Sequence, residues 1–328
     1  MGLMPVELFY YRLLFHWVDN SPDFSVIRNF VAPFIENPGN SVIFNIAEGW
    51  NNRIYQIGKG YMLKTPLNHE NARHLDLEVR ISRFLQGKIS VPVPSFLHYG
   101  RMEDGNFAAL YRRLAGSNIT NKEYGRQEDR VKPEDLEEGA RREFFRDISR
   151  ISIEIMSIPV KQVPEIDRKG GTVLIKHYMD MLQLARDNIF NSIDRNSGIR
   201  IESYFKDMLK PEVFNFTPCF IHGDLGGWNI LYDREAMKIS GLLDWGNASV
   251  SDPAMDYSEL VYDYGNEFST VFMKYMNGTG IKFHKGFLKR SDFYVRISGI
   301  IDALYGIEKQ DDAYLKHGLD EIERAFGL

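Results

Sequence analysis

The stretch that decides the fold reads IHGDLGGWNILYD at residues 221–233 and resumes as SGLLDWGNASVSDPAMDYSEL at residues 240–260. Asp224 stands five residues before Asn229, across a loop whose two adjacent glycines allow the backbone to approach a ligand closely. Asp244 follows fifteen residues after Asn229, at the end of the apolar run GLL. We expect the two short strands on either side of this loop to form a hairpin-like platform that holds these three polar side chains together.

These three side chains suit phosphoryl transfer. In that reaction Mg²⁺ bridges phosphate oxygens and neutralises developing charge. The ion prefers oxygen ligands, typically one or two carboxylates together with phosphates and water. Asp244 and Asn229 offer two such oxygens, and Asp224 is predicted to hold an acceptor hydroxyl in line and to accept its proton. The pattern predicts a Mg²⁺-dependent transfer of a phosphoryl group to a hydroxyl.

Residues 40–115 carry the turn signals and β-rich runs of a small antiparallel sheet with one inserted helix. SVIFNIA, RIYQI and YMLKT predict three strands, and VPVPSFLHYGR and FAALYRRLAG predict two more. Between these groups, residues 69–86 have helical periodicity. Lys64 lies on the third strand, and Glu78 lies on the same helical face as two leucines. Because a carboxylate on such a face is costly to bury unless it is paired, we predict that Glu78 orients Lys64.

The remainder of the chain is expected to be mostly helical. Helical periodicity is found at about 4–18, 24–35, 133–157, 174–193 and from 254 onward. The polar residues 116–132 predict a hinge followed by a mobile loop. We therefore expect an α+β chain in two lobes. The N-lobe, residues 1–115, would hold the sheet, and the largely helical C-lobe, residues 116–328, would hold the catalytic loop and the acceptor pocket.

Composition excludes several classes of protein. A net charge of -5 gives no indication of nucleic-acid binding, and no apolar run is long enough to span a bilayer. Cys219 is the single cysteine, so neither an intrachain disulfide nor a thiolate metal cluster can form. We expect a cytoplasmic protein without a nucleic-acid or membrane partner, as a monomer or weak dimer.

The quoted stretches resemble the aminoglycoside phosphotransferase and choline kinase superfamily, relatives of the protein kinases. IHGDLGGWNILYD is similar to the catalytic loop of that family, and SGLLDWGNASVSDPAMDYSEL to its metal-binding segment and the Asp-Pro-x-x-Asp that follows. EVRISRFLQGKISVPVP, at residues 78–94, resembles the family's helix and the Val-Pro that ends it. The Asp-aromatic-Gly stretch that leads into Ser-Asp-Pro is most similar to the 2″-type aminoglycoside phosphotransferases. The resemblance covers residues 42–264 and implies a two-lobed protein-kinase-like fold. A role in antibiotic resistance and a role in metabolism would differ only in the acceptor, and both stay open here.

The same resemblance implies a role for each matching residue. Asp224 would be the catalytic base, and Asn229 and Asp244 would hold Mg²⁺. Lys64, paired with Glu78, would bind the phosphates of ATP or GTP.

Further positions would support the site. Asp256 would brace the catalytic loop, and His222 would be structural. The hinge near Tyr111, Arg112 and Arg113 would contact the nucleotide base through its backbone.

The acceptor pocket would be acidic if the substrate is a polycationic aminoglycoside, because each ammonium group that loses water needs a carboxylate partner. Glu259, Asp263 and Glu267 recur at four-residue spacing, on one face of the helix expected after Asp256. A solvated helix face is the alternative interpretation. Further acidic candidates stand near the C-terminus at Asp302, Asp311 and Asp312.

Three alternatives stay open at this point. A metabolic kinase of choline, a sugar, homoserine or a macrolide would use the same catalytic residues. A nucleotide-binding pseudokinase would lack some of them, and none is missing here. A Mg²⁺-dependent hydrolase would not need Lys64 and Glu78. Protein kinases themselves are disfavoured, because the first hairpin turn reads EGWNN without three glycines and Gly223 stands where their catalytic loop has arginine.

Overall fold

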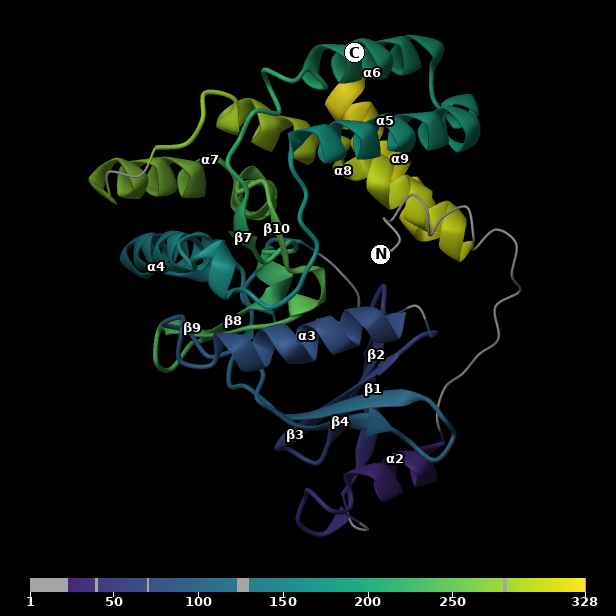
Figure 1. The fold of residues 1–328 in the computed structure, drawn as a ribbon, viewed down its shortest axis with the longest axis vertical. Helices are drawn as coiled ribbons and strands as arrows, with labels where there is room; N and C mark the ends of the chain where they lie inside the picture. The colour runs from purple at the N-terminus through teal and green to yellow at the C-terminus, as the bar shows by residue number, and fades with distance from the viewer. Residues whose placement is uncertain (1–22, 39–40, 70, 123–129, 280–281, 328) are drawn as a thin grey trace.

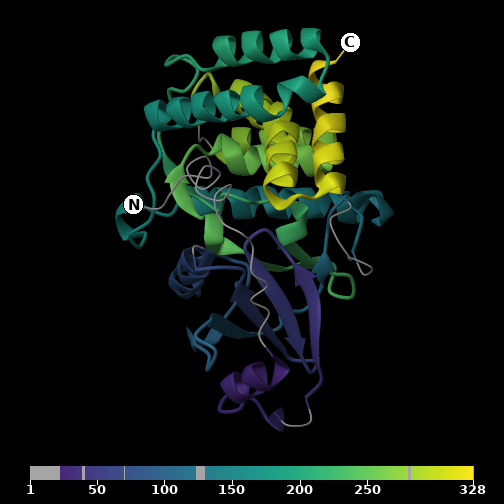
Figure 2. The same cartoon turned by 90° about the vertical axis from the view of Figure 1, so that its right-hand side faces the viewer.

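The computed structural model describes residues 23–38, 41–69, 71–122, 130–279 and 282–327. The helix expected at residues 4–18 lies outside these ranges. Over the described ranges, the helices are all too short or too polar to cross a membrane. Figures 1 and 2 show a sheet at one end of the molecule and a stack of helices at the other. This arrangement is the α+β, two-lobed, kinase-like fold that the sequence predicts.

A five-stranded antiparallel sheet forms the N-lobe (Figure 1), and its strand order is β1-β2-β3-β5-β4. The strands are β1 (Ile43–Glu48), β2 (Asn52–Ile57), β3 (Tyr61–Pro66), β4 (Phe96–Arg101) and β5 (Phe107–Arg112). Helix α2 (Phe24–Val31) packs Ile27 and Val31 against one face of the sheet, and α3 (Asn71–Leu85) packs against the other. Helix α2 ends four residues before the expected boundary, because Pro33 cannot continue a helix.

The catalytic loop lies between two different small sheets. Before the loop, β7 (Cys219–Ile221) pairs with β10 (Ser249–Ser251). After it, β8 (Ile230–Asp233) pairs with both β6 (Ser117–Asn118) and β9 (Lys238–Leu242). The single hairpin-like platform predicted around the loop is therefore wrong, because β7 and β8 do not pair. Since β5 belongs to one sheet and β6 to another, we propose the lobe boundary at residues 115–116.

Helices make up most of the C-lobe. They are α4 (Glu138–Met156), α5 (Gly171–Asn188), α6 (Arg195–Met208), α7 (Ala254–Thr279), α8 (Phe287–Lys309) and α9 (Asp312–Phe326). Helix α4 begins later than residue 133, because residues 133–135 form a separate 3-10 turn that starts with Pro133. Helix α7 is interrupted at Gly265, whose φ of 68° and ψ of -155° lie outside the helical region.

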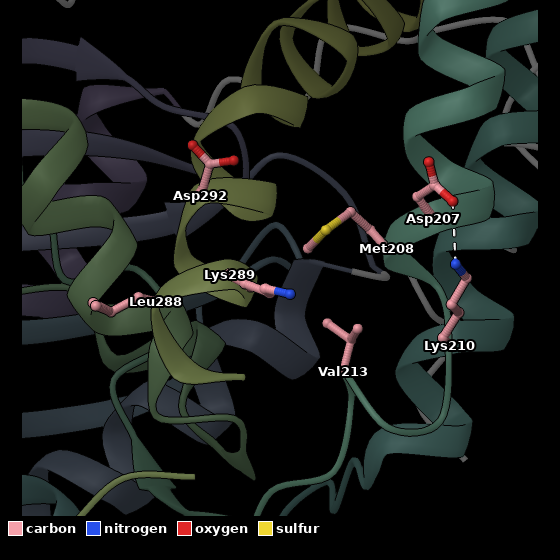
Figure 3. Close-up of a pocket in the computed structure, with 7 residues that line it drawn as sticks. All are labelled: Asp207, Met208, Lys210, Val213, Leu288, Lys289 and Asp292. Atoms are coloured by element: carbon pink, nitrogen blue, oxygen red, sulfur yellow. Dashed lines mark hydrogen bonds and ion pairs between the residues drawn. The ribbon is translucent and has the colours of Figure 1, made fainter. Parts of the chain in front are cut away.

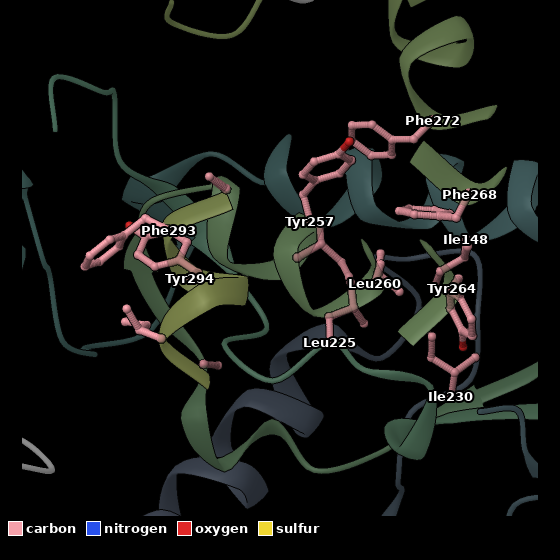
Figure 4. Close-up of a cluster of buried hydrophobic side chains, with 14 of the residues drawn as sticks. Ile148, Leu225, Ile230, Tyr257, Leu260, Tyr264, Phe268, Phe272, Phe293 and Tyr294 are labelled. Atoms are coloured by element: carbon pink, nitrogen blue, oxygen red, sulfur yellow. The ribbon is translucent and has the colours of Figure 1, made fainter. Parts of the chain in front are cut away.

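The main hydrophobic core holds the catalytic loop on the side that faces α7 (Figure 4). Leu225 and Ile230 stand before and after the loop's glycines, and both are fully buried. They belong to the same cluster as Leu260, Tyr264 and other apolar side chains of α7. Burial of one such aliphatic side chain contributes about 1.5–3 kcal/mol. The loop backbone is therefore tied to α7 on both sides of its functional residues.

Candidate active site

Lys64 forms the centre of an ion-pair network between the two lobes. Its Nζ donates to both carboxylate oxygens of Glu78, at 2.7 and 2.8 Å, and to Oδ1 of Asp244 at 3.2 Å. Burial alone disfavours the ammonium, but the carboxylates of Asp244 and Glu78 outweigh it and raise the pKa of Lys64 above its ordinary value. The contact between Lys64 and Glu78 that the sequence predicts is present, and Lys64 also joins β3 to the segment after β9.

Asp244 is held in an unusual backbone conformation where β9 has ended. Its φ of 61° and ψ of 64° are left-handed, a region that residues other than glycine seldom adopt. Such a conformation persists only where the surrounding structure enforces it, and it is common at functional sites. Burial opposes the charged form of Asp244, yet Lys64 holds the pKa of this carboxyl below its ordinary value. Asp244 is therefore a preformed carboxylate next to the lysine.

Asp224 is positioned by two side chains of its own loop. The indole Nε1 of Trp228 donates to Oδ1 of Asp224 at 3.0 Å, and the amide of Asn229 donates to Oδ2 at 3.0 Å and to the Asp224 carbonyl oxygen at 2.9 Å. Burial, together with the charge of Asp244, raises the pKa of Asp224 to about 7. Trp228 was missed by the sequence analysis, because an indole four residues after a carboxylate carries no recognisable signal.

The buried carboxylate of Asp256 fixes the backbone of the catalytic loop. Asp256, in the first turn of α7, accepts from the backbone N–H groups of His222 and Gly223, both at 2.8 Å. Gly223 has a φ of +81°, and a Cβ there would lie 2.2 Å from the carbonyl oxygen of Asn247, so the position requires glycine. The imidazole Nε2 of His222 lies 2.8 Å from the carbonyl oxygen of Leu243, and burial lowers the pKa of His222 to about 4. These contacts are the ones that the expected supporting roles of Asp256 and His222 require.

The carboxylate of Asp263 is hydrogen-bonded to the backbone of the catalytic loop and is therefore not available to bind an acceptor. Its carboxylate accepts from the backbone N–H of Gly227 at 3.0 Å and from that of Asn121 at 2.8 Å. Glu267 is also displaced from the expected face, because the regular helical spacing is broken at Gly265. Glu267 is exposed and pairs with Arg141 at 3.0 Å. Of the three acidic residues predicted on one helical face, only Glu259 has an uncommitted carboxylate.

Glu259 stands in an acidic region that continues from Asp224 toward α8. Neither a hydrogen bond nor an ion pair joins its carboxylate to the rest of the described chain. Burial, followed by the charges of Asp224, Asp256, Asp302 and Asp263, raises the pKa of Glu259 to about 8. Asp302 lies within 3.7 Å of the imidazole of His317, and its pKa is raised to about 6, mainly by burial.

The two other C-terminal candidates have ordinary surroundings. Asp311 caps the first turn of α9 by accepting from the N–H groups of Ala313 and Tyr314. Asp312 is exposed. Asp302 is thus the C-terminal candidate that shares the electrostatic environment of Glu259.

We expect the stability difference between wild type and Glu259→Gln to depend on pH. Because the folded pKa of about 8 exceeds the ordinary value of 4.5, the folded state binds a proton more tightly than the unfolded chain. The stability that this group contributes is complete below pH 4.5 and is lost as the pH rises toward 8. Glutamine imitates the protonated form, so the variant should match wild type at low pH and exceed it by on the order of 1–3 kcal/mol at high pH.

Urea unfolding across the pH range measures this difference. The control is Glu267→Gln, which replaces an exposed carboxylate beyond the break at Gly265 and should change stability by less than about 1 kcal/mol, as is usual for an exposed ion pair. A gap between Glu259→Gln and wild type that stays constant with pH would contradict the raised pKa.

The face of the N-lobe sheet that carries Lys64 also presents an exposed aromatic ring. In the strand register, Lys64 lies opposite Ile54 and Ala109, and the next row is Phe44, Gln56, Met62 and Tyr111. Directly opposed residues of antiparallel strands share a face. Phe44 is 53% exposed although it belongs to this row. Along this row Gln56 and Met62 are half-buried and Tyr111 is buried, so the uncovered apolar surface is the ring of Phe44 at the β1 end.

The expected hinge has part of its backbone already engaged. The N–H of Arg113 donates to the carbonyl oxygen of Gly60 at 2.9 Å, and Tyr111 is buried with its ring against Phe96. Arg112 is exposed and lies with its guanidinium 5.6 Å from the ring centre of Tyr61. The N–H of Arg113 is therefore not available to a nucleotide base.

A Mg²⁺ ion fits the donor set if phosphates and water supply most of its ligands. The amide nitrogen of Asn229 donates to Asp224, which leaves its carbonyl oxygen as an acceptor. With Asp244, this gives one amide oxygen and one carboxylate. In the described residues, no group of three or more histidine, cysteine, aspartate or glutamate side chains could hold a metal alone. This is the donor set typical of Mg²⁺ bound together with a nucleotide.

A hollow of about 540 Å³ lies apart from these residues (Figure 3). It is lined by Asp207, Met208, Lys210, Val213, Leu288, Lys289 and Asp292. None of these residues belongs to the cluster around Lys64 and Asp224.

Comparison with known proteins identifies related sequences. Residues 43–281 match the model of the phosphotransferase enzyme family, APH. Viomycin phosphotransferase of Streptomyces vinaceus is 36% identical over 55 residues, a match that spans 16% of this chain and 19% of that protein. The uncharacterized protein YcbJ of Bacillus subtilis strain 168 is 22% identical over 231 residues, which are 68% of this chain and 69% of that protein.

Solved structures with the same fold include antibiotic phosphotransferases. The GDP and kanamycin complex of an APH(2″) enzyme aligns with a TM-score of 0.78 at 20% identity, over 92% of this chain and 97% of that one. Macrolide 2′-phosphotransferase type I aligns with a TM-score of 0.72 at 17% identity, over 94% of this chain and 99% of that one. At these identities the likeness establishes the fold.

Proposed function

Because the chain belongs to the phosphotransferase enzyme family, we propose that it transfers the γ-phosphate of ATP or GTP to a hydroxyl of an amine-bearing, aminoglycoside-like compound. The observation that carries the choice of acceptor is the uncommitted Glu259 carboxylate in an acidic region next to Asp224. An ammonium group of the acceptor would neutralise this region. If the acceptor is such an antibiotic, the biological role is resistance.

Each residue of the site has a distinct part in the proposed reaction. Lys64, oriented by Glu78, would bind the nucleotide phosphates, and Asp244 and Asn229 would hold Mg²⁺. When bound, the ion would neutralise charge on the phosphates. Asp224 would orient the acceptor hydroxyl and take its proton. The hydrogen bonds from Trp228 and Asn229 fix the rotamer of Asp224, so that the carboxylate is aligned before the acceptor arrives.

The nucleotide base would lie against the face of the N-lobe sheet that carries Lys64. Phe44 supports this placement, since it is exposed on the face that carries Lys64. The hinge backbone would contact the edge of the base. Complexes of structural relatives contain GDP, ADP or ATP, which supports a purine nucleotide as donor.

Acceptor binding tests the proposal. We expect wild type to bind kanamycin-like compounds and to phosphorylate them in a coupled assay. Above pH 8, where the Glu259 carboxyl is charged, Glu259→Gln should weaken acceptor binding by about 10- to 100-fold, because a charge-assisted contact is worth about 1.5–3 kcal/mol. Nucleotide affinity should be unchanged. Isothermal titration measures both affinities.

The matched control is Glu267→Gln, which removes a carboxylate of the same helix that is paired with Arg141. It should leave acceptor affinity within about twofold of wild type, as is usual for exposed ion pairs. If wild type binds no aminoglycoside, or if Glu259→Gln binds as tightly as wild type, the acceptor is a neutral or singly charged metabolite.

A further inference from the structure

The turn between β1 and β2 contacts the C-terminal helices through three aromatic side chains. The ring of Trp50, in the turn, stacks on that of Tyr305 in α8, with centroids 4.0 Å apart and planes inclined by 10°. The indole Nε1 of Trp50 lies 3.4 Å from the hydroxyl of Tyr314 in α9, and the two tyrosine rings meet edge to face at 5.0 Å. We call Trp50, Tyr305 and Tyr314 the aromatic latch. It joins residues that are more than 250 positions apart, since Trp50 and Tyr314 are separated by 264.

The register places this turn directly beyond Lys64. Ile54 of β2 lies opposite Lys64, and Asn52 lies opposite Pro66, so the turn extends past the end of β3. The backbone N–H of Leu67 donates to the carbonyl oxygen of Asn51 and holds the turn to the chain that follows β3. In protein kinases the turn between the first two strands covers the phosphates. Here the turn has one glycine and a tryptophan, and the contact with the C-lobe comes from the indole ring.

The C-lobe half of the latch adjoins the acidic region. Asp302 precedes Tyr305 by three residues on α8, which places both on the same side of that helix. The charge of Asp302 acts on Tyr314 as well as on Glu259. The latch therefore joins the turn next to Lys64 to the part of the C-lobe that borders the proposed acceptor site.

The contact is one that can open during a catalytic cycle. Trp50 is 40% exposed, and its hydrogen bond to Tyr314 is long. Water can therefore replace much of the contact that the indole ring loses when it separates from the two tyrosines. A stacked aromatic pair shifts an equilibrium by only about two- to tenfold. Closure of loops over substrates, followed by opening for product release, limits turnover in many enzymes.

We propose that the aromatic latch holds the β1–β2 turn closed over the nucleotide and that the nucleotide leaves after Trp50 separates from Tyr305. Trp50 is thus a positioning residue that acts through the turn. The proposal rests on the nucleotide-binding part of the proposed function and is independent of the identity of the acceptor.

Release of a fluorescent nucleotide tests the latch. N-methylanthraniloyl GDP and ADP are bound to the full-length protein with Mg²⁺, and dissociation is followed by stopped flow. Trp50→Ala and Tyr305→Ala should each accelerate release by about two- to tenfold. The double variant should release no faster than the faster single variant, because both substitutions remove the same contact. Trp50→Phe, which retains a stacking ring, should stay near wild type.

The matched control is Phe34→Ala. Phe34 is similarly exposed, at 37%, and stacks on His98 with centroids 4.4 Å apart, but both residues lie in the N-lobe. It should leave release unchanged. Release by Trp50→Ala at the wild-type rate, multiplicative effects of the two single variants, or equal acceleration by Phe34→Ala would overturn the latch alone. Absence of nucleotide binding by wild type would overturn the proposed function and the latch with it.

Discussion

Asp224→Asn should lower turnover by about 10²–10⁴-fold, the contribution typical of a positioned general base, while nucleotide affinity stays within a few-fold of wild type. The structure supports this separation, because the carboxylate contacts Trp228 and Asn229 and has no contact with Lys64. Asparagine has nearly the same shape but carries only one acceptor oxygen. It can therefore accept from Trp228 or from Asn229, but not from both.

Turnover in a coupled assay and nucleotide binding by titration measure the two effects separately. Trp228→Phe serves as a control for alignment alone, because it removes the indole donor at Oδ1 and leaves the carboxylate in place. Its turnover should fall by much less than that of Asp224→Asn. Asp244→Ala should show the opposite pattern, with Mg²⁺-dependent nucleotide binding lost. If Asp224→Asn turns over near the wild-type rate, another group accepts the proton.

Much of this site was predictable from the sequence, because phosphoryl transfer restricts which side chains can stand close together. The strand context of Lys64 and the leucine-bearing helical face of Glu78 predicted their contact, and the structure has it at 2.7 Å. The five strands of the N-lobe were also predicted, since β-rich runs separated by tight turns leave few alternatives.

Features that depend on tertiary packing were not predictable. Regular helical spacing placed Glu259, Asp263 and Glu267 on one face, but Gly265 breaks the helix and Asp263 turns to the backbone of the catalytic loop. Pairing of β7 with β10 was missed for a similar reason. Two short strands adjacent in sequence suggest a hairpin, whereas the partner of β7 comes after Asp244.

The aromatic latch left no local signal at all. Trp50 interrupts what would be a glycine-rich turn, and from the sequence this only disfavoured a protein kinase. Its partners are in the last two helices, and long-range contacts of this kind have no period or spacing to reveal them. The same limit applies to Arg290, which the sequence did not single out.

Asp252→Ala should lower the free energy of unfolding by about 3–5 kcal/mol, the loss expected when one partner of a buried ion pair is removed. Asp252 and Arg290 are both 0% exposed. The guanidinium donates to both carboxylate oxygens, and the hydroxyl of Tyr294 donates to Oδ2 at 2.7 Å. Without Asp252 the guanidinium keeps its hydrogen bond to the carbonyl oxygen of Val213, at 2.9 Å, and its position 5.0 Å from the ring centre of Phe216. It stays charged in the core without a carboxylate partner.

Urea unfolding measures the loss, and Asp180→Ala is the control. Asp180 pairs with Lys176 on the surface of α5, so its removal should change stability by less than about 1 kcal/mol. Replacement of both partners, Asp252→Leu with Arg290→Met, should cost less than Asp252→Ala alone, because no buried charge is left unpaired. A double variant that is less stable than the single variant would contradict this account.

Asp252→Ala should also lower the turnover of the enzyme that remains folded. Oδ1 of Asp252 accepts from the backbone N–H of Ala254 at 3.0 Å and so fixes the first turn of α7. Asp256 stands in that turn and holds the backbone of His222 and Gly223, directly before Asp224. Turnover of Asp252→Ala, measured well below its unfolding midpoint, should therefore fall while nucleotide affinity is retained, because Lys64 and Asp244 lie on other elements. Wild-type turnover in the folded variant would show that the ion pair supports the core without positioning the catalytic loop.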